Sequence, residues 1–204
     1  MGMFKNKGSD FPGVYYQDEH TVTIYDQYPK SIVHLLVLPQ KNILNLDSLG
    51  PQDVPILLEM KKTKDLIIQH LSGPQEPKSK LNLEYKSGFH AIPSMNHLHL
   101  HIISNDFLLV KNAKHYQSFN SSYLVPIEDI ILGLEENGRV ENYAKMREIK
   151  EFDKKDLIAP DGTNFKRAFK KLKDHMAQQF YAIHGDYQIH LPLLLMKTEW
   201  KYSI

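Results

Sequence analysis

Short apolar runs separated by polar turns make up most of the first half of the chain. The runs are rich in valine, isoleucine, leucine and tyrosine, which favours strands. Polar residues and prolines between the runs are typical of turns. The pattern predicts strands at residues 14–16, 21–25, 32–38, 81–89 and 97–103. We therefore expect an α+β unit with a mainly antiparallel sheet.

A helical period separates the third run from the fourth. This helix is expected to follow Asp53, a candidate N-cap, and to end before Gly73 and Pro74. A shorter helix is predicted over residues 126–134, ending near Gly138. The repeating positions of the first helix are Leu57, Met60, Lys64, Ile67 and Leu71.

The clearest amphipathic pattern lies near the C-terminus. Asn164 is a candidate N-cap, and large apolar residues then recur every three or four positions, which predicts a helix. The apolar stripe is Phe165, Ala168, Phe169, Leu172, Met176 and Phe180. The opposite face carries Lys166, Arg167, Lys170, Lys171 and Lys173.

Composition narrows the classes of function. The 204 residues have a net charge of +1, so no global basic field attracts nucleic acid. No apolar run approaches the roughly 18 residues of a membrane span, and we expect no membrane partner. The absence of cysteine excludes disulfides, cysteine nucleophiles and thiolate metal sites. We predict an N-terminal extension (1–13), a main unit (14–135) and a C-terminal module (136–204).

Three histidines alternate with leucines at His97, His99 and His101, and His90 lies just upstream. On a strand the three imidazoles would share one face and span roughly 13 Å. That span suits a phosphate with two substituents better than a single metal ion. Two other interpretations stay open: a metal site built on a His-x-His pair, and a histidine-rich strand without chemistry.

Phosphoryl chemistry is the interpretation that uses the histidines together. A neutral imidazole is a good nucleophile towards phosphorus near neutral pH. The central histidine can attack in line while its neighbours bind oxygens or move protons. Crowded imidazoles also disfavour each other's protonation, which keeps the nucleophile neutral until an anionic substrate binds. No metal is required where histidines and backbone N–H groups offset the developing charge.

The segment 97–103 resembles the signature of the histidine-triad (HIT) family, in which three histidines alternate with apolar residues. The segment 30–39 is similar to that family's earlier strand, which brings another histidine to the nucleotide pocket. Longer segments resemble the aprataxin branch, which removes adenylate from DNA. These are Asp26–Lys30, Gly88–Met95, Ile103–Phe107 and Lys111–Asn120. The resemblance implies a HIT fold, an antiparallel sheet with flanking helices, plus a small C-terminal helical finger-like module.

The resemblance also implies roles for the residues at matching positions. His99 would be the nucleophile that becomes adenylylated, and His101 would hold the phosphate and orient it. His90 would protonate the departing DNA 5′-phosphate, and His97 would support the other three. Asp26 would hold the ribose hydroxyls, although from the residues alone a solvated turn is the alternative. The implied AMP-binding and phosphate-binding residues are Asp26, Lys30, His34, Ser94 and Met95.

A polar, basic segment follows the last strand and is predicted to be a loop. The resemblance implies that its small donors and cations grip the phosphates of DNA without reading sequence. Ala113 stands where the family usually has another basic residue. The implied DNA-binding residues are Lys111, Lys114, His115, Ser118 and Asn120.

The C-terminal module lacks the metal ligands that the resemblance implies. Aprataxins end in a zinc finger whose cysteine positions fall here at Ala159 and Gly162, and whose last ligand falls at Gln179. Only His175 remains, and structural zinc needs four ligands. We therefore expect a metal-free module packed through its apolar stripe, with extra burial replacing the metal. The alternative is coordination rebuilt from His175, His184, His190 or Asp186.

These observations lead to one function with two alternatives. We expect a monomeric DNA 5′-adenylate hydrolase that removes AMP from adenylated DNA ends or nicks through a histidine–AMP intermediate, in the nucleus as the family implies. One alternative is a HIT hydrolase of small adenosine phosphoramidates or dinucleotides. The other is a DNA-end-binding protein with a vestigial site. Phe4 or Phe11 would have to serve as the aromatic wedge that the family inserts at a DNA end.

Overall fold

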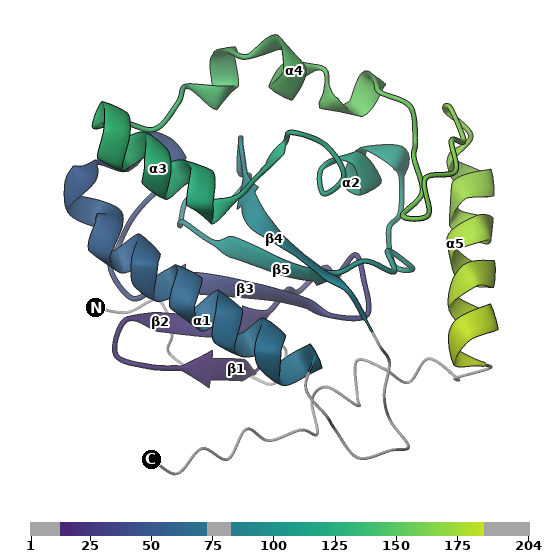
Figure 1. Cartoon of the computed structure of the whole chain (residues 1–204), viewed down its shortest axis with the longest axis horizontal. Coiled ribbons are helices and arrows are strands. Elements are labelled where there is room, and N and C mark those ends of the chain that lie inside the picture. The colour runs from purple at the N-terminus through teal and green to yellow at the C-terminus, as the bar shows by residue number, and fades with distance from the viewer. Residues whose placement is uncertain (1–12, 73–82, 186–204) are drawn as a thin grey trace.

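One six-stranded sheet organises the protein (Figure 1). The structure is a computed structural model that describes residues 13–72 and 83–185. The strands lie in the order β1-β2-β3-β5-β4-β6, and each neighbouring pair is antiparallel. This confirms the predicted α+β class and antiparallel sheet. The strands are β1 (Val14–Gln17), β2 (Thr21–Tyr25), β3 (His34–Pro39), β4 (Tyr85–His90), β5 (Leu100–Ser104) and β6 (Leu124–Val125).

Helices flank the sheet on one face and at one end. In Figure 1, α1 and α3 lie on the side of the molecule away from α5, which stands near α2. The described helices include none that is long and apolar enough to cross a membrane. The α-helices are α1 (Val54–Ser72), α2 (Ala113–Gln117), α3 (Ile127–Asn137), α4 (Arg147–Lys150) and α5 (Phe169–His184).

The two faces of the central strands have different surroundings. Alternate residues of β3 and β5 enter the main core, where α1 and α3 pack: Leu35, Val37, Leu100 and Ile102. The residues between them point to the other face. There Leu36 and Gly88 lie opposite His101 on its two neighbouring strands. A Cβ on Gly88 would meet Leu124 and the Val125 carbonyl at 2.8 Å, so only glycine fits this position.

A second apolar cluster joins the C-terminal module to the histidine face of the sheet. Leu172 and Met176, one turn apart on α5, are buried in a cluster with residues of the segment 103–119. This is the packing predicted for the apolar stripe. The buried members of the cluster are Ile103, Phe107, Val110, Tyr116, Phe119, Leu157, Ala159, Leu172 and Met176.

Several predicted boundaries were wrong. The segment 111–120 contains the helix α2, because Asn112 Oδ1 caps it by accepting the His115 N–H at 2.8 Å. The C-terminal helix begins at Phe169, not after Asn164, because Asn164 pairs with Ile158 in a β-bridge. Such pairing depends on contacts that helical periodicity does not report.

The predicted cap of the first helix was also wrong. Asp53 ends a short 3-10 turn (Pro51–Asp53) that runs into α1, and its carboxylate accepts the Gly50 N–H at 3.1 Å. Several predictions fall outside the described residues: the N-terminal extension with Phe4 and Phe11, the stop at Gly73 and Pro74, and most of the C-terminal tail. The division into three domains stays a prediction.

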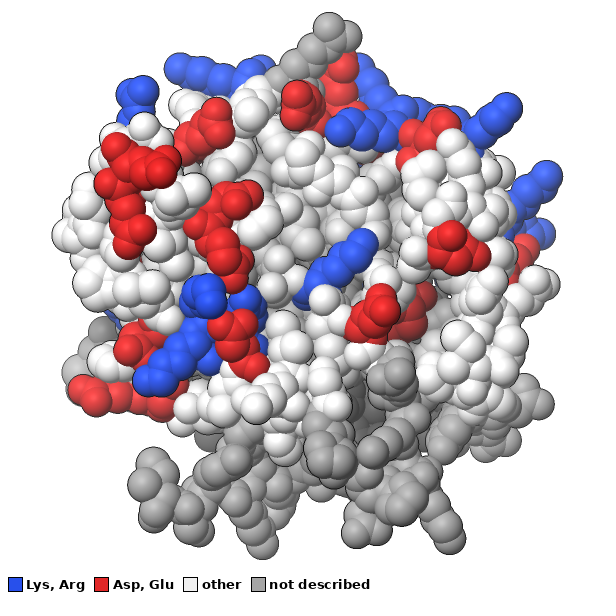
Figure 2. Space-filling model, in the orientation of Figure 1, with Lys and Arg blue, Asp and Glu red and all other residues white. Residues whose placement is uncertain are grey.

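Charge is mixed on the face that Figure 2 shows. Acidic side chains gather over α3, whose exposed residues include Glu128, Asp129, Glu135 and Glu136. Lysines and arginines are interspersed with acidic residues elsewhere on this face rather than forming a continuous basic surface. This face therefore offers a polyanion no continuous basic surface.

Candidate active site

Four histidines from separate parts of the sheet meet on the face opposite the main core. His34 lies in β3, His90 ends β4, His101 lies in β5 and His99 directly precedes β5. The ring centroid of His101 is 5.2 Å from that of His34, 4.3 Å from His90 and 4.9 Å from His99. The fold therefore makes one imidazole cluster, centred on His101, out of residues up to 67 positions apart.

The predicted row of three equivalent histidines is only partly formed. Strand pairing begins at Leu100, so His97 and His99 lie before β5, and the predicted strand start at residue 97 was wrong. His97 uses its Nε2–H to bind the Pro39 carbonyl at 3.2 Å. We conclude that His97 fixes the approach to the strand, whereas His99 and His101 contact each other.

A single backbone contact sets the tautomer of His99. Its Nδ1 lies 2.7 Å from the carbonyl oxygen of His97. A carbonyl can only accept, so Nδ1 carries the proton and Nε2 keeps its lone pair in the neutral ring. His99 thus offers a free nitrogen nucleophile at Nε2.

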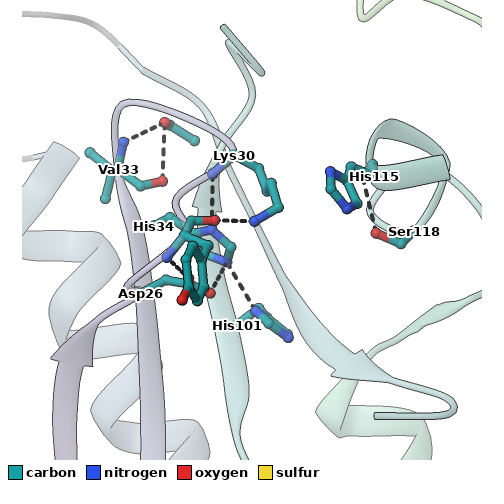
Figure 3. Close-up of polar contacts among 9 residues, drawn as sticks. Asp26, Lys30, Val33, His34, His101, His115 and Ser118 are labelled. Atoms are coloured by element: carbon teal, nitrogen blue, oxygen red, sulfur yellow. Dashed lines mark hydrogen bonds and ion pairs between the residues drawn. The ribbon is translucent and has the colours of Figure 1, made fainter. Parts of the chain in front are cut away.

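A chain of hydrogen bonds sets the tautomer of His101 (Figure 3). The Lys30 N–H donates to His34 Nδ1 at 3.2 Å, so the neutral His34 ring carries its proton on Nε2. That proton is donated to His101 Nδ1, which lies 3.0 Å away. His101 must then carry its own proton on Nε2, a buried atom without a partner among the described residues. The cluster therefore presents one unused N–H donor beside one free nucleophilic nitrogen.

Burial keeps these rings neutral. The side chains of His34, His99 and His101 belong to residues that are only 3%, 8% and 4% exposed. Burial lowers the pKa of His34 to about 4, and it lowers the pKa of His101 well below the ordinary value. The pKa of His99 also falls, again chiefly through burial. An empty site at neutral pH is therefore uncharged at its centre.

Burial also lowers the pKa of His90, but this histidine has a different hydrogen-bond partner. Burial, and then His99, His34 and Lys30, lower its pKa to about 3, while a hydrogen bond to the Ser118 backbone acts in the opposite direction. A backbone bond that favours the charged ring must be to a carbonyl. Since Nε2 of His90 has no partner in the described protein, Nδ1 makes this bond and Nε2 is unprotonated in the free site. His90 becomes an acid only after a bound anion raises its pKa.

Asp26 and Lys30 are brought to this cluster, whereas Ser94 and Met95 make no hydrogen bond to it in the described structure. Asp26 Oδ2 is 3.5 Å from His34 Nε2, and Oδ1 accepts the Tyr28 N–H at 2.6 Å. Lys30 Nζ donates to the Tyr28 carbonyl, and burial lowers its pKa. Ser94 and Met95 are exposed in the segment between β4 and His97. Their implied contacts with AMP stay a prediction.

The predicted DNA-binding residues fall into two groups: basic residues near His115, and residues whose side chains are hydrogen-bonded inside the protein. Burial, followed by Lys30, Lys111 and Lys114, lowers the pKa of His115, which shows that these cations gather beside it. Figure 3 shows His115 and Lys30 facing the same space near His101. We call Lys30, Lys111, Lys114 and His115 the basic rim.

Ser118 and Asn120 are engaged inside the protein instead. Ser118 Oγ donates to the His115 carbonyl at 3.0 Å and is mostly buried. Asn120 accepts from Lys86 Nζ and donates to the Tyr116 carbonyl, so its amide group already has partners on both sides. Both residues hold the α2 segment in place, and their implied contacts with DNA stay a prediction.

Two residues of the site were not found from the sequence. The Phe119 ring packs against His34, His90 and His101, with centroids 5.3, 4.7 and 5.2 Å away. Asp106 is half-buried and accepts the N–H groups of Ile32 and Leu108, each at 3.1 Å, which fixes the segment after Lys30. Burial raises the pKa of Asp106. Both lie in segments that carry the family resemblance, which was the available signal.

A metal is a poor fit to this cluster. Within the described part of the chain, Asp26, His34 and His101 form the one group of three or more potential metal ligands. The nitrogens of His34 and His101 are 3.0 Å apart while their ring centroids are 5.2 Å apart, so the nitrogens point at each other. Metal ligands point instead at a shared third position. His34 Nε2 and His101 Nδ1 are instead placed to share a proton in a hydrogen bond.

Comparison with known proteins agrees with this arrangement. A family model described as "Scavenger mRNA decapping enzyme C-term binding" matches residues 3–116. A HIT domain-containing protein of Dictyostelium discoideum is 42% identical over 159 residues, covering 76% of this chain and 40% of that protein. Aprataxin of Danio rerio is 39% identical over 128 residues, covering 62% of this chain and 38% of that protein. The chain thus spans about two fifths of these relatives' length.

Solved structures extend the likeness to most of the described chain. The crystal structure of the aprataxin ortholog Hnt3 in complex with DNA has a TM-score of 0.57 and 28% identity, covering 83% of this chain and 87% of that one. The crystal structure of the aprataxin ortholog Hnt3 from Schizosaccharomyces pombe has a TM-score of 0.56 and 29% identity, covering 83% of this chain and 85% of that one. The chain therefore belongs to the histidine-triad superfamily, within the family described as scavenger mRNA decapping enzyme C-term binding, and it is similar to aprataxin.

Proposed function

We propose that this protein is a DNA 5′-adenylate hydrolase that removes AMP from adenylated ends or nicks. One observation carries the proposal: the free Nε2 of His99 beside the buried, unpartnered Nε2 atoms of His101 and His90. That arrangement supplies a nucleophile and two polar atoms for one phosphate. Similarity to aprataxins, one of which is solved in complex with DNA, supports adenylated DNA as the substrate.

The reaction would proceed in two displacements at the same phosphorus. His99 Nε2 attacks the phosphorus of AMP, forming a P–N bond as the P–O bond to the DNA 5′-phosphate breaks. Water then attacks the same phosphorus, the P–N bond breaks, and AMP leaves with His99 restored. His101 Nε2–H would donate to a non-bridging oxygen, whose negative charge grows in each transition state.

Charge enters this site with the substrate. The buried histidines are neutral in the free protein, and the phosphates of adenylated DNA bring negative charge among them. That charge favours the protonated form of His90, which can then protonate the departing 5′-phosphate. Lys30, half-buried above the cluster, would offset the remaining charge.

Binding would use the periphery of the cluster. Asp26 would accept hydrogen bonds from the ribose hydroxyls, and Ser94 and Met95 would contact the AMP phosphate. The basic rim would bind the DNA backbone without reading sequence. We further propose that the protein acts as a monomer in the nucleus and needs no metal for this reaction.

The decisive experiment compares two substrates. Purified protein is incubated with 5′-adenylated nicked DNA and, separately, with adenosine phosphoramidate, and AMP release is measured. The proposal expects much faster release from DNA. Faster turnover of the small molecule would identify a small-nucleotide hydrolase, and DNA binding without turnover of either substrate would identify a binding protein. His20→Ala, at an exposed histidine away from the cluster, is the matched control.

A further inference from the structure

A tight turn in the C-terminal module points one carboxylate at α5. The Ala159 N–H donates to the Thr163 carbonyl, and the Gly162 N–H donates to the Ala159 carbonyl, each at 2.9 Å. Gly162 has a φ of +86°, a left-handed conformation that favours glycine. Asp161 lies inside this turn, and its backbone is thereby fixed relative to the helix.

Asp161 binds two α5 residues at once. Its Oδ2 is 2.7 Å from His175 Nε2 and 3.3 Å from Gln179 Nε2. His175 and Gln179 are four residues apart and so share one face of the helix. We call Asp161, His175 and Gln179 the clasp. One oxygen atom thus ties the turn to two successive turns of α5.

The clasp occupies the region where the resemblance implies a zinc site. The implied ligand positions are Ala159 and Gly162 on the turn and His175 and Gln179 on α5, so turn and helix meet where a metal would join them. The residues do not fit zinc: Ala159 and Gly162 have no donor side chain, and Asp161 already saturates His175 Nε2. Ala159 is only 4% exposed and belongs to the second apolar cluster.

Apolar burial accompanies the clasp. Leu172 is fully buried and Met176 is 4% exposed, and both belong to the apolar cluster that contains Phe107, Tyr116 and Phe119. Burial of such side chains favours folding, which offers a source of folding free energy other than a metal. The centroid of the Phe165 ring lies 5.0 Å from that of the His175 ring, so this aromatic side chain packs beside the clasp.

The segment just before this turn is hydrogen-bonded to α2, the helix that carries two residues of the basic rim. Tyr116 of α2 donates its hydroxyl hydrogen to the Ile158 carbonyl at 2.6 Å. Gln117 Nε2 donates to the carbonyls of Lys155 and Asp156 at 3.0 and 2.8 Å. Segment 155–161 is therefore held by α2 through backbone carbonyls and by α5 through Asp161. Lys114 and His115 of the basic rim lie on this α2.

We propose that Asp161 takes the place of the metal in this module, and that the clasp is a positioning device for the basic rim. The first part concerns folding only. The second part rests on the proposed function, since it predicts that the clasp affects binding of DNA and leaves the chemical step unchanged. Asp161 contacts neither the histidine cluster nor the rim directly in the described structure.

Folding is tested with Asp161→Ala, Asp161→Asn and the control Asp174→Ala, which changes an exposed acidic residue on α5. We expect zinc-free protein whose melting temperature is unaffected by a chelator. Asp161→Ala should melt a few degrees lower and exchange α5 amides faster, whereas Asp161→Asn, which keeps an acceptor oxygen, should recover part of the loss. Stoichiometric zinc, chelator sensitivity, or equal melting of Asp161→Ala and Asp174→Ala would overturn the replacement of the metal.

Positioning is tested by separating KM from kcat on adenylated nicked DNA. Asp161→Ala should raise KM severalfold with kcat nearly unchanged, and Asp161→Asn should restore most of the affinity. An unchanged KM, or a fall in kcat alone, would overturn the positioning role. Wild-type protein that releases no AMP from DNA would overturn the proposed function and this role with it, whereas the folding measurements would still decide whether Asp161 replaces a metal.

Discussion

Two histidine sites in this protein differ in how their ring nitrogens are used. In the sheet, His90 and His101 each keep a buried Nε2 without a partner, and His99 keeps a free Nε2. On α5, the Nε2 of His175 is hydrogen-bonded to Asp161 at 2.7 Å, and both side chains are partly exposed.

Burial and hydrogen-bond partners together separate reactive from structural imidazoles. Burial without a fully engaged counter-charge keeps a ring neutral and leaves one nitrogen for a substrate. A direct carboxylate partner accepts a hydrogen bond from the ring and so occupies the nitrogen that could react. The sheet histidines are therefore suited to chemistry, and His175 is suited to holding the module together.

The largest expected effects come from removing one histidine from each site. His99→Ala should lower kcat on adenylated DNA by on the order of 10⁴-fold, because the nucleophile is lost, with little change in melting temperature. His175→Ala should retain kcat and lower the melting temperature by about 2–4 °C, since this partly exposed pair is screened by solvent. Activity and thermal melting measure the two effects. Retained turnover in His99→Ala would refute its nucleophilic role.

The hydrogen-bond chain through His34 offers a second, smaller test. His34→Leu should lower kcat by on the order of 10²-fold, because no donor remains at this position to fix the tautomer of His101. DNA affinity should stay close to that of the wild type. Steady-state kinetics with adenylated DNA, beside His20→Leu as the control, would show this. Equal kcat in the two variants would mean that the chain has no role in orienting His101.

The depressed pKa values predict unusual resistance of activity to mild acid. A nucleophilic histidine with the ordinary pKa of about 6.5 would lose about tenfold in kcat/KM at pH 5.5. Burial lowers the pKa of His99, so a clearly smaller loss is expected in a pH–rate profile. An acid limb centred at pH 6.5 would show instead that His99 is not desolvated in the free protein.

The same groups predict how stability depends on pH. The folded pKa values of His34 and His90 are about 4 and 3, below the value of about 6.5 in the unfolded chain. Between pH 6.5 and these folded values, the unfolded chain binds more protons than the folded protein. Their contribution is unchanged above about pH 6.5 and destabilises the fold progressively as the pH falls towards 4 and 3. Chemical denaturation at several pH values would measure this slope. A flat profile from pH 6.5 to 4 would contradict burial of neutral histidines.

The smallest expected effect concerns the basic rim between the two sites. Lys114→Ala removes one exposed cation from α2 and should weaken DNA binding a few-fold, reducing the salt dependence of log Kd by about one unit. Turnover of adenosine phosphoramidate, if any, should be unaffected. Binding titrations at several salt concentrations, with Lys62→Ala on α1 as the control, would detect it. An unchanged salt slope would place the DNA path away from Lys114.

Local patterns predicted most elements of the fold but fewer of its boundaries. Strands β1, β2 and β3 and helix α3 follow from apolar runs and turn residues, whose effects are local. The start of β5 was missed because His97 turns towards the Pro39 carbonyl, a contact 58 residues away. Helix α2 was missed because one cap, Asn112, stabilises five residues that show no apolar period.

The sequence alone determined which chemistry this protein can perform. Three alternating histidines, a fourth upstream and no cysteine favour a neutral nitrogen nucleophile and exclude thiolate chemistry, because side-chain type fixes the available donors. Tertiary structure decided which nitrogen is free. The carbonyl of His97 and the N–H of Lys30 assign the protons of His99 and His34 locally, but the proton of His101 is assigned only when the sheet brings His34 Nε2 to its Nδ1 across 67 residues. The carboxylate of Asp161 likewise reaches His175 only when the turn that carries it packs on α5. Protonation depends on burial and on partners in space, which spacing along a chain does not contain.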